Sequence, residues 1–181
     1  MSSENDLYTR FLEGEEYLFD VIVLTYRKQL TGYLFSITKD IHISEEIAED
    51  VFVKLWFRKP IRKEPSSLKT FLYTIGRNMA IDHLRKQKRV LETDFDSQID
   101  AISCINPLEA VEFDEKKAEI NRALQKLNKD YAEVLVLTSE GFSQDEISKI
   151  MKKKKKSVYD LLYRARKSLR DEIARESNEN R

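Results

Sequence analysis

The 181-residue sequence is poor in the residues that make tight turns, since it has only four glycines and three prolines. A β-rich fold needs such residues at its many turns, so their scarcity argues against one. Charged residues make up 35 % of the chain, and the apolar residues recur mostly every three or four positions. This period is that of an amphipathic helix, and it predicts an all-α protein.

Cysteine and long apolar runs are almost absent as well. The single Cys104 cannot form a disulfide within the chain, and it excludes a zinc site built from cysteines. No stretch approaches the roughly 18 apolar residues of a membrane span, and the acidic N-terminus lacks the apolar core of a signal peptide. These absences predict a cytoplasmic protein with no membrane insertion.

Recognisable catalytic signatures are also missing. His42 and His83 are the only histidines, and neither stands in the H-x-x-x-H spacing of a zinc site. The sequence contains no P-loop, no G-x-S-x-G and no G-x-G-x-x-G motif, and no pair of carboxylates stands out as a general acid and base. We therefore predict no catalytic residues, no metal and no cofactor.

The net charge is zero, but the charges are unevenly distributed along the chain. Residues 1–89 hold 15 basic and 13 acidic groups. Residues 90–115 hold no basic and 8 acidic groups, and residues 116–181 hold 17 basic and 11 acidic groups. Blocks of different sign indicate separate parts with separate partners. The expected organisation is a first helical domain over residues 1–90, a flexible acidic linker over residues 91–106, and a second helical domain over residues 107–181.

The clearest functional pattern is a helix-turn-helix in residues 141–169. Gly141 ends one helix, Ser143 caps a short second helix, and a turn separates that helix from a longer final one. Five lysines at residues 152–156 span the turn and the start of the final helix. Cations there oppose the helix dipole, so we interpret them as phosphate ligands rather than as a solvated loop. In this layout the final helix enters the major groove of DNA by its N-terminal end.

A second candidate nucleic-acid surface lies in residues 67–89. Ser67 or Ser66 is the expected helix cap. An apolar stripe with helical spacing is expected to face inward: Leu68, Leu72, Ile75 and Met79. The polar side is expected to present Tyr73 and Arg77 and to end in a basic cluster. Aromatic rings mixed with cations suit unpaired bases, because rings stack on bases and cations hold the backbone. The alternative is that Phe71 and Tyr73 are core residues.

A third candidate surface lies on a helix that is expected to begin at Ser44 and to end before Pro60. Three apolar residues, spaced by four, are expected to face inward: Ile47, Val51 and Leu55. The remaining surface mixes acidic and apolar side chains: Glu46, Glu49, Asp50, Val53 and Phe57, with Phe52 and Trp56 at the edges. Such a mixture suggests a protein partner. The alternative is a core helix with a solvated acidic side.

Two further stretches complete the expected helices. One is an amphipathic helix over about residues 15–38, with Val21 and Leu24 among its inward residues. The other begins with the helical periodicity that returns at Leu108, and it leads to a short helix capped by Asn128.

Two of these stretches closely resemble the second conserved region of bacterial sigma-70 family factors. They are SEEIAEDVFVKLW at residues 44–56 and LKTFLYTIGRNMAIDHLRK at residues 68–86. FSQDEISKIM at residues 142–151 and SVYDLLYRARKSL at residues 157–169 resemble the fourth region. Only the short acidic linker separates the two, with no third sigma domain between them, so the chain resembles the extracytoplasmic-function group.

The resemblance implies a sigma factor that binds core RNA polymerase and directs promoter-specific initiation without chemistry of its own. The first domain would dock on the clamp coiled coil of the β′ subunit and would recognise and melt the minus-ten element. The second domain would meet the β flap and read the minus-thirty-five element as duplex. An anti-sigma protein that holds the factor is implied as well.

The resemblance also assigns roles to particular residues. Those implied to bind polymerase are Glu49, Asp50, Phe52, Lys54 and Trp56. Those implied to contact DNA in the first domain, beside residues 61–67, are Lys69, Tyr73, Arg77, Asn78, Arg85 and Lys86. Those expected to contact DNA in the second domain are Lys154, Lys155, Lys156, Ser157, Tyr159 and Arg164. The sequence departs from the family at Lys152, where a glycine is usual in the turn, and at Leu161, where an arginine is common.

Two other hypotheses stay open on the residues alone. A two-domain regulator could bind duplex DNA without polymerase, but the acidic and apolar helix face around Asp50 would then be unexplained. An enzyme acting on nucleic acid would need a cluster of metal ligands or a nucleophile, and the sequence offers no such cluster.

Overall fold

The computed structural model describes residues 4–59, 67–93 and 115–179, and these residues form eight helices and no strand. They fall into two compact units, which are described separately. The first unit holds α1 (Glu4–Leu12), α2 (Leu18–Thr38), α3 (Ile41–Arg58) and α4 (Leu68–Thr93), and the second holds α5 (Glu115–Lys126), α6 (Lys129–Ser139), α7 (Gln144–Met151) and α8 (Lys155–Glu179). The predicted all-α class is confirmed for the described residues.

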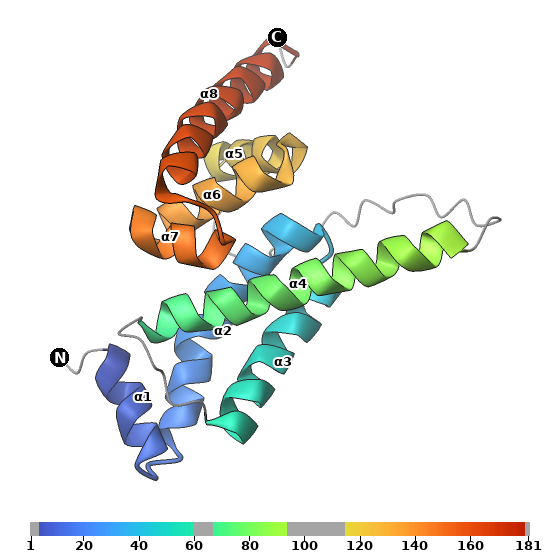
Figure 1. Ribbon diagram of the computed structural model, residues 1–181. Coiled ribbons are helices and arrows are strands. Elements are labelled where there is room, and N and C mark those ends of the chain that lie inside the picture. Colours follow the sequence, from blue (N-terminus) through green and yellow to red (C-terminus); the bar gives the residue numbers. More distant parts are fainter. Residues whose placement is uncertain (1–3, 60–66, 94–114, 180–181) are drawn as a thin grey trace. The chain divides into compact units, whose positions relative to one another are not determined.

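In the first unit, α2, α3 and α4 pack on one another, and α1 packs against α2 and α4 (Figure 1). The buried side chains that these helices share are mostly aliphatic and include Ile22, Leu30, Leu34, Ala48, Val51, Leu55, Leu68 and Leu72. Gly76 lets α4 approach α2 closely, because a Cβ atom at this position would lie 3.3 Å from Leu30 Cδ1 and 3.2 Å from Leu34 Cδ2. A side chain at residue 76 would crowd this crossing.

The predicted start of α3 at Ser44 is wrong. Asp40 is the N-cap, because its backbone is extended and its carboxylate accepts a hydrogen bond from Ile43 N at 3.1 Å. Ser44 lies buried in the following turn, where its Oγ donates to the Asp40 carbonyl and lies 2.7 Å from Thr38 Oγ1. The serine is therefore engaged by the preceding turn and does not cap the helix.

The expected helix over residues 15–38 is shorter, and α1 in front of it was not predicted. A turn separates the two helices at Gly14, whose φ of 111° favours glycine. Val21 and Leu24, which were expected to face inward, are instead exposed, Leu24 by 82 %. The apolar residues of α2 surround more of the helix than one buried face requires, so periodicity alone assigned two of them to the wrong side.

Of the two serines predicted as caps of α4, Ser67 has this role, because its Oγ accepts a hydrogen bond from Thr70 N at 3.1 Å. Of its predicted stripe, Leu68 and Leu72 are buried, whereas Ile75 and Met79 are half-buried. The helix continues to Thr93, so residues 91–93 are helical rather than the beginning of the linker. The rest of the predicted linker lies outside the described residues, as does the predicted start of helical structure at Leu108.

In the second unit, α8 packs against α5, α6 and α7. Its predicted signals are confirmed: Asn128 caps α6, Gly141 follows it with a φ of 84°, and Ser143 forms a reciprocal capping box with Glu146. The buried core includes Leu127, Val134, Leu137, Ile147, Ile150, Met151, Val158, Leu162 and Ala165. The short helix α7, the turn and the long helix α8 thus form the predicted helix-turn-helix.

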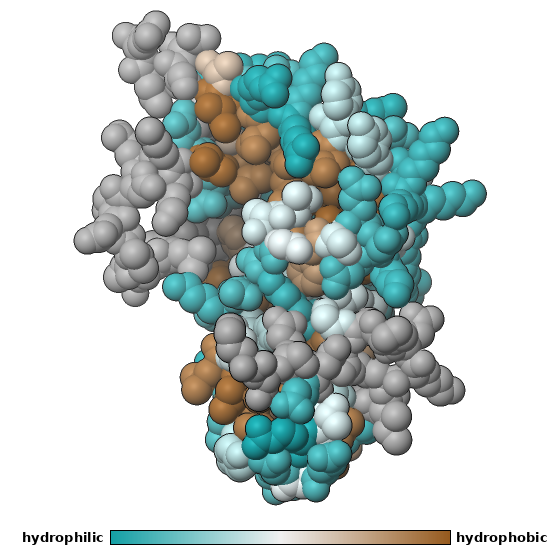
Figure 2. Space-filling model, turned by 90° about the vertical axis from the view of Figure 1, so that its left-hand side faces the viewer, coloured by the Kyte–Doolittle hydropathy of each residue, from teal (hydrophilic) through white to brown (hydrophobic). Residues whose placement is uncertain are grey.

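None of the eight helices in the described residues combines the length and the apolar character that crossing a membrane requires. Hydrophobic side chains do reach the surface in places, and Figure 2 shows such areas among hydrophilic ones on one face.

Candidate functional site

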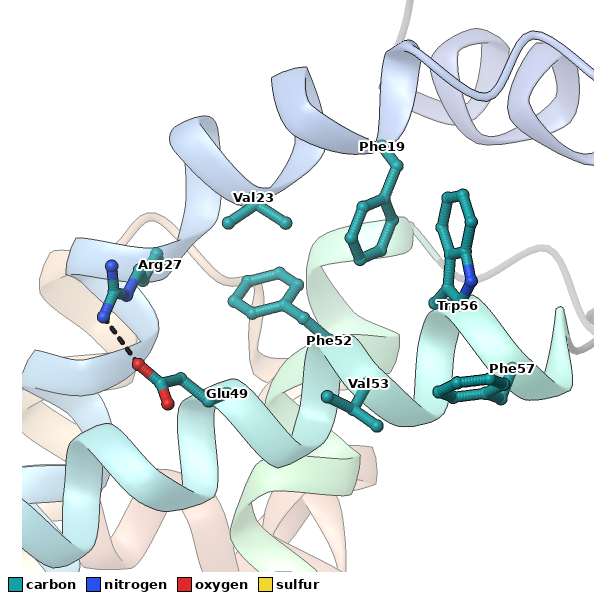
Figure 3. Close-up of a pocket in the computed structure, with 8 residues that line it drawn as sticks. All are labelled: Phe19, Val23, Arg27, Glu49, Phe52, Val53, Trp56 and Phe57. Atoms are coloured by element: carbon teal, nitrogen blue, oxygen red, sulfur yellow. Dashed lines mark hydrogen bonds and ion pairs between the residues drawn. The ribbon is translucent and has the colours of Figure 1, made fainter.

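An open apolar pocket lies between α2 and α3 of the first unit, with a volume of about 310 Å³ (Figure 3). Its lining residues come from both helices: Phe19, Val23, Arg27, Glu49, Phe52, Val53, Trp56 and Phe57. Phe52 is buried, whereas Val53 and Phe57 are exposed by 49 % and 79 %. Large exposed apolar side chains beside a pocket are typical of a surface that another molecule covers.

The two ends of this pocket are held by different interactions. At one end, the Arg27 guanidinium of α2 and the Glu49 carboxylate of α3 form an ion pair with an N–O distance of 2.7 Å (Figure 3). At the other end, the rings of Phe19 and Trp56 meet edge to face, with centroids 4.9 Å apart. Both contacts join α2 to α3, so the pocket is formed before any partner binds.

The residues predicted to bind polymerase all lie on α3, but they differ in exposure. Glu49, Asp50 and Lys54 are exposed, Trp56 is half-buried and Phe52 is buried. Phe52 can therefore line the pocket but cannot stand out from the surface. The sequence did not reveal the contribution of α2, because the residues of α2 that meet the pocket depend on how the two helices pack.

Two residues predicted to contact DNA from α4 lie in the core instead. Tyr73 is completely buried and its ring stacks on Tyr33, with centroids 4.8 Å apart. Arg77 is also buried. The prediction that both side chains stand on the polar side of the helix is wrong, and the alternative that Tyr73 is a core residue is correct. Aromatic side chains gain more from burial than spacing alone reveals.

The other residues predicted on α4 remain accessible. Lys69 is half-buried, with its Nζ 5.8 Å from the centroid of the Tyr73 ring, and Asn78 is half-buried as well. Arg85 and Lys86 are exposed. The end of α4 extends beyond α2 and α3 (Figure 1) and carries a basic surface of exposed side chains: Arg85, Lys86, Lys88 and Arg89. Residues 61–66, which the resemblance assigns to the same function, lie outside the described residues.

The six predicted contacts of the second unit are all exposed on one continuous segment. Lys154 ends the turn, and the other five residues lie on the first three turns of α8: Lys155, Lys156, Ser157, Tyr159 and Arg164. Tyr163 was not predicted, although it is exposed by 69 % and stands one turn after Tyr159. Its spacing of four residues from Tyr159 is the signal that could have indicated it.

The positive charge of the lysine-rich turn is compensated more than the sequence suggested. Lys153 Nζ lies 3.0 Å from Asp130 Oδ2 of α6, and Lys155 Nζ lies 2.8 Å from Asp145 Oδ1 of α7. Two of the five lysines therefore have an acidic partner within the protein. The interpretation of all five lysines as phosphate ligands therefore applies fully only to the other three.

A charged corner joins α1 to α2. Arg10 donates two hydrogen bonds to the Glu15 carboxylate, at 2.7 and 2.6 Å, and the Tyr17 hydroxyl donates a third at 2.8 Å. These hydrogen bonds, with Arg10 contributing most, lower the pKa of Glu15 to about 2. Across the described residues, no group of three or more His, Cys, Asp or Glu side chains could hold a metal ion.

Comparison with known families matches both units. The family sigma-70 region 2 matches residues 22–90, and the family sigma-70 region 4 matches residues 117–169. The ECF RNA polymerase sigma factor SigX of Bacillus subtilis is 31 % identical over 161 residues, which cover 86 % of this chain and 83 % of SigX. The RNA polymerase sigma-H factor of Pseudomonas aeruginosa is 26 % identical over 176 residues, which cover 92 % and 91 % of the two chains.

Solved structures share the fold. The sigma factor RpoE of Bartonella quintana, in complex with the anti-sigma factor NepR, matches with a TM-score of 0.72 and 24 % identity, covering 86 % of this chain and 96 % of that one. CnrH, in complex with the cytosolic domain of CnrY, matches with a TM-score of 0.63 and 20 % identity, covering 94 % and 96 %.

Proposed function

The chain belongs to the extracytoplasmic-function group of the sigma-70 family, and from that premise we propose how its parts divide the work of a sigma factor. A sigma factor directs transcription initiation by RNA polymerase as a non-catalytic subunit. On this proposal, residues 1–90 dock on core polymerase and open the minus-ten element. Residues 107–181 read the minus-thirty-five element as duplex DNA, and residues 94–106, which follow the end of α4, link the two domains.

The docking site for the clamp coiled coil of the β′ subunit is the pocket between α2 and α3. The observation that supports this assignment is the exposure of Val53 and Phe57 beside the carboxylates of Glu49 and Asp50. Apolar groups give such an interface its affinity, and neighbouring charges give it orientation and a faster encounter. Lys54 and Trp56 belong to the same surface, and Phe52 supports it from below.

The minus-ten element is bound by the accessible residues of α4: Lys69, Asn78, Arg85 and Lys86. Their cations hold the backbone of the DNA, and the sigma factor stabilises bases that have left the duplex. This selective stabilisation lowers the free energy of strand opening without any covalent step. Tyr73 contributes by packing next to Lys69, whose Nζ lies 5.8 Å from the centroid of its ring, and Arg77 is buried in the free protein as well.

The minus-thirty-five element is bound by the turn and the start of α8. Lys154, Lys155 and Lys156 surround the N-terminal end of the helix that enters the major groove. Contacts from lysine to phosphate position the protein but carry no base sequence themselves, so groove shape contributes to selectivity. Ser157, Tyr159 and Arg164 meet base edges on this proposal, and their exposure on the first turns of α8 supports it.

Three further assignments complete the proposal. The second unit also meets the flap of the β subunit, an anti-sigma protein holds the factor inactive, and the protein works in the cytoplasm with the polymerase. The complex of RpoE with NepR supports the second of these, because there a sigma factor of the same fold is bound to an anti-sigma factor.

The decisive test is run-off transcription with core polymerase and a library of genomic fragments. We expect initiation at a small set of promoters that core polymerase alone does not use. Initiation at no fragment beyond those that core polymerase uses by itself would disprove the proposed promoter function.

The docking site is tested by Asp50→Ala and Trp56→Ala, measured by competition with labelled wild-type protein for core polymerase. Truncation of a central interface residue commonly lowers affinity by at least about tenfold. The control Asp171→Ala removes an exposed carboxylate from α8 and should leave core affinity unchanged. Unchanged affinity in both α3 variants would remove the pocket from the docking site.

A further inference from the structure

Trp56, the only tryptophan of the chain, contacts aromatic rings from two other helices. Its ring meets Phe19 of α2 edge to face at 4.9 Å, and it meets Phe11 of α1 at a centroid distance of 5.7 Å. Phe11 and Phe19 are themselves 5.6 Å apart. The indole therefore stands at the edge of an aromatic cluster rather than on a bare helix surface.

The helix α1 is an integral part of this cluster, although it lies before residue 22, where the match to sigma-70 region 2 begins. Phe11 is completely buried and Tyr8 nearly so, and their ring centroids lie 6.1 Å apart. These two rings hold α1 in place, so the position of Phe11 against Trp56 is defined by packing.

Lys59 closes the cluster from the other side. It follows the last residue of α3 in a left-handed conformation, with a φ of 35°. Its Nζ lies 5.0 Å from the centroid of the Phe11 ring and 5.3 Å from that of Trp56, and it also pairs with the Glu16 carboxylate at 3.4 Å. One cation thus contacts α1, α3 and the α1–α2 turn at once, and both rings attract it.

We propose that Phe11 and Lys59 are positioning residues that hold the Trp56 indole in the orientation that polymerase binds. The inference rests on the proposed docking of polymerase at the pocket between α2 and α3. An aromatic side chain that is already fixed in the free protein loses less conformational entropy on binding. The functional docking unit therefore includes α1, which lies outside the matched region.

Two variants test the positioning function in the full chain. Lys59→Met keeps the aliphatic stem but removes the cation, and Phe11→Leu keeps an apolar side chain but removes the ring. Trp56 is the only tryptophan, so acrylamide quenching of the fluorescence of the free protein reports its exposure directly. We expect stronger quenching in both variants and an affinity for core polymerase lower by about threefold to tenfold.

The controls separate positioning from general damage. Arg58→Met removes a neighbouring exposed cation of the same helix and should change neither quenching nor affinity. Lys59→Arg restores a cation above the two rings and should recover both. Binding of duplex DNA by the second unit should stay unchanged in every variant. If Phe11→Leu fails to fold, the comparison of Lys59→Met with Lys59→Arg still tests whether the cation positions Trp56.

The outcomes distinguish this inference from the docking proposal. Stronger quenching with unchanged core affinity would overturn the inference, and so would unchanged quenching in both variants. If Trp56→Ala itself leaves core affinity unchanged, the docking proposal fails and the positioning function fails with it. The inference is supported if Lys59→Met and Phe11→Leu both show stronger quenching and lower affinity for core polymerase, and if Lys59→Arg restores both to the wild-type values.

Discussion

At the scale of single residues, three lysines stand out because they adopt a positive φ at the ends of helices. Lys39, Lys59 and Lys152 follow α2, α3 and α7 in the left-handed region, where glycine is the usual residue. A cation at a helix C-terminus is favourable to the dipole, but a side chain in this conformation is strained. At these positions the cation stabilises the helix end, whereas the positive φ of a non-glycine residue destabilises the backbone.

Lys152→Gly should raise the free energy of unfolding by about 0.5–1 kcal/mol, because glycine adopts the observed φ of 52° without strain. Urea or thermal denaturation of the full chain measures this change. The matched control is Lys167→Gly, which lies exposed in the interior of α8 and should destabilise by about 1 kcal/mol. A loss of stability in Lys152→Gly would show that the lysine side chain contributes more than its backbone strain costs.

Glu15→Gln should remove an acid-sensitive contribution to stability at the α1–α2 corner. The folded state lowers the pKa of Glu15 to about 2 from an ordinary value of 4.5, so its ion pair stabilises above the ordinary pKa. That stability is lost as the pH falls from about 4.5 towards 2. Thermal midpoints should therefore differ between variant and wild type at pH 7 and converge near pH 2. A difference that does not depend on pH would contradict the role of the charge.

At the scale of elements, the turn between α7 and α8 combines the lysines proposed to bind DNA with acidic partners inside the protein. Lys153 and Lys155 are paired with Asp130 and Asp145, whereas Lys154 and Lys156 are exposed. On the proposed function, phosphates and these aspartates would compete for the same cations. The affinity of this element for duplex DNA should therefore fall when lysines are removed and rise when an aspartate is removed.

Replacing Lys154, Lys155 and Lys156 together with alanine should weaken binding of upstream duplex DNA. The dependence of the binding constant on salt should flatten by up to about 0.9 logarithmic units for each lysine that meets a phosphate. Thermal stability should change little, because the lost Lys155–Asp145 pair is exposed and the removed cations oppose the dipole. Fluorescence anisotropy across a salt series measures the slope.

The control for this variant is Lys129→Ala, which removes an exposed cation from the first turn of α6. It should leave both affinity and slope unchanged. An unaltered slope in the triple variant would show that these lysines do not meet phosphate.

Asp145→Asn should have the opposite effect and strengthen binding to duplex DNA of any sequence. The substitution frees Lys155 from a partner at 2.8 Å and removes a negative charge from the DNA-facing surface. The gain should be a few-fold at low salt and should shrink as salt rises, because both effects are electrostatic. Anisotropy with specific and unrelated duplexes measures it, and weaker binding to both would contradict the competition.

At the scale of the whole molecule, the described residues form two compact units with separate cores. The apolar pocket belongs to the first unit and the helix-turn-helix to the second. The lining residues of the pocket all lie in the first unit, and α7 and α8 both lie in the second, so the two activities should be separable.

Separate expression of residues 1–102 and 103–181 should yield two folded helical proteins. The first should compete for core polymerase but fail to bind upstream duplex. The second should bind upstream duplex and compete for core polymerase only weakly, through the flap of the β subunit. Circular dichroism, the competition assay and anisotropy measure these outcomes. An unfolded fragment, or a fragment 103–181 that carries the full affinity for core polymerase, would contradict the division.

Local signals in the sequence were sufficient for much of the second unit. The caps at Asn128 and Ser143 and the stop at Gly141 were all predicted, because each depends on contacts within three or four residues. The same holds for Ser67 at the start of α4. At Ser44 the local signal was misleading, because Asp40 offers a competing cap one turn earlier.

The sequence by itself determined the helical class, the two-part organisation and the family, because these depend on periodicity, charge blocks and ordered motifs. Only the tertiary structure decided that Tyr73 and Arg77 are buried, that α1 supports Trp56 and that α2 forms half of the pocket. Each of these depends on residues far apart in the chain, and a helical period does not specify which neighbouring helix covers which part of a surface.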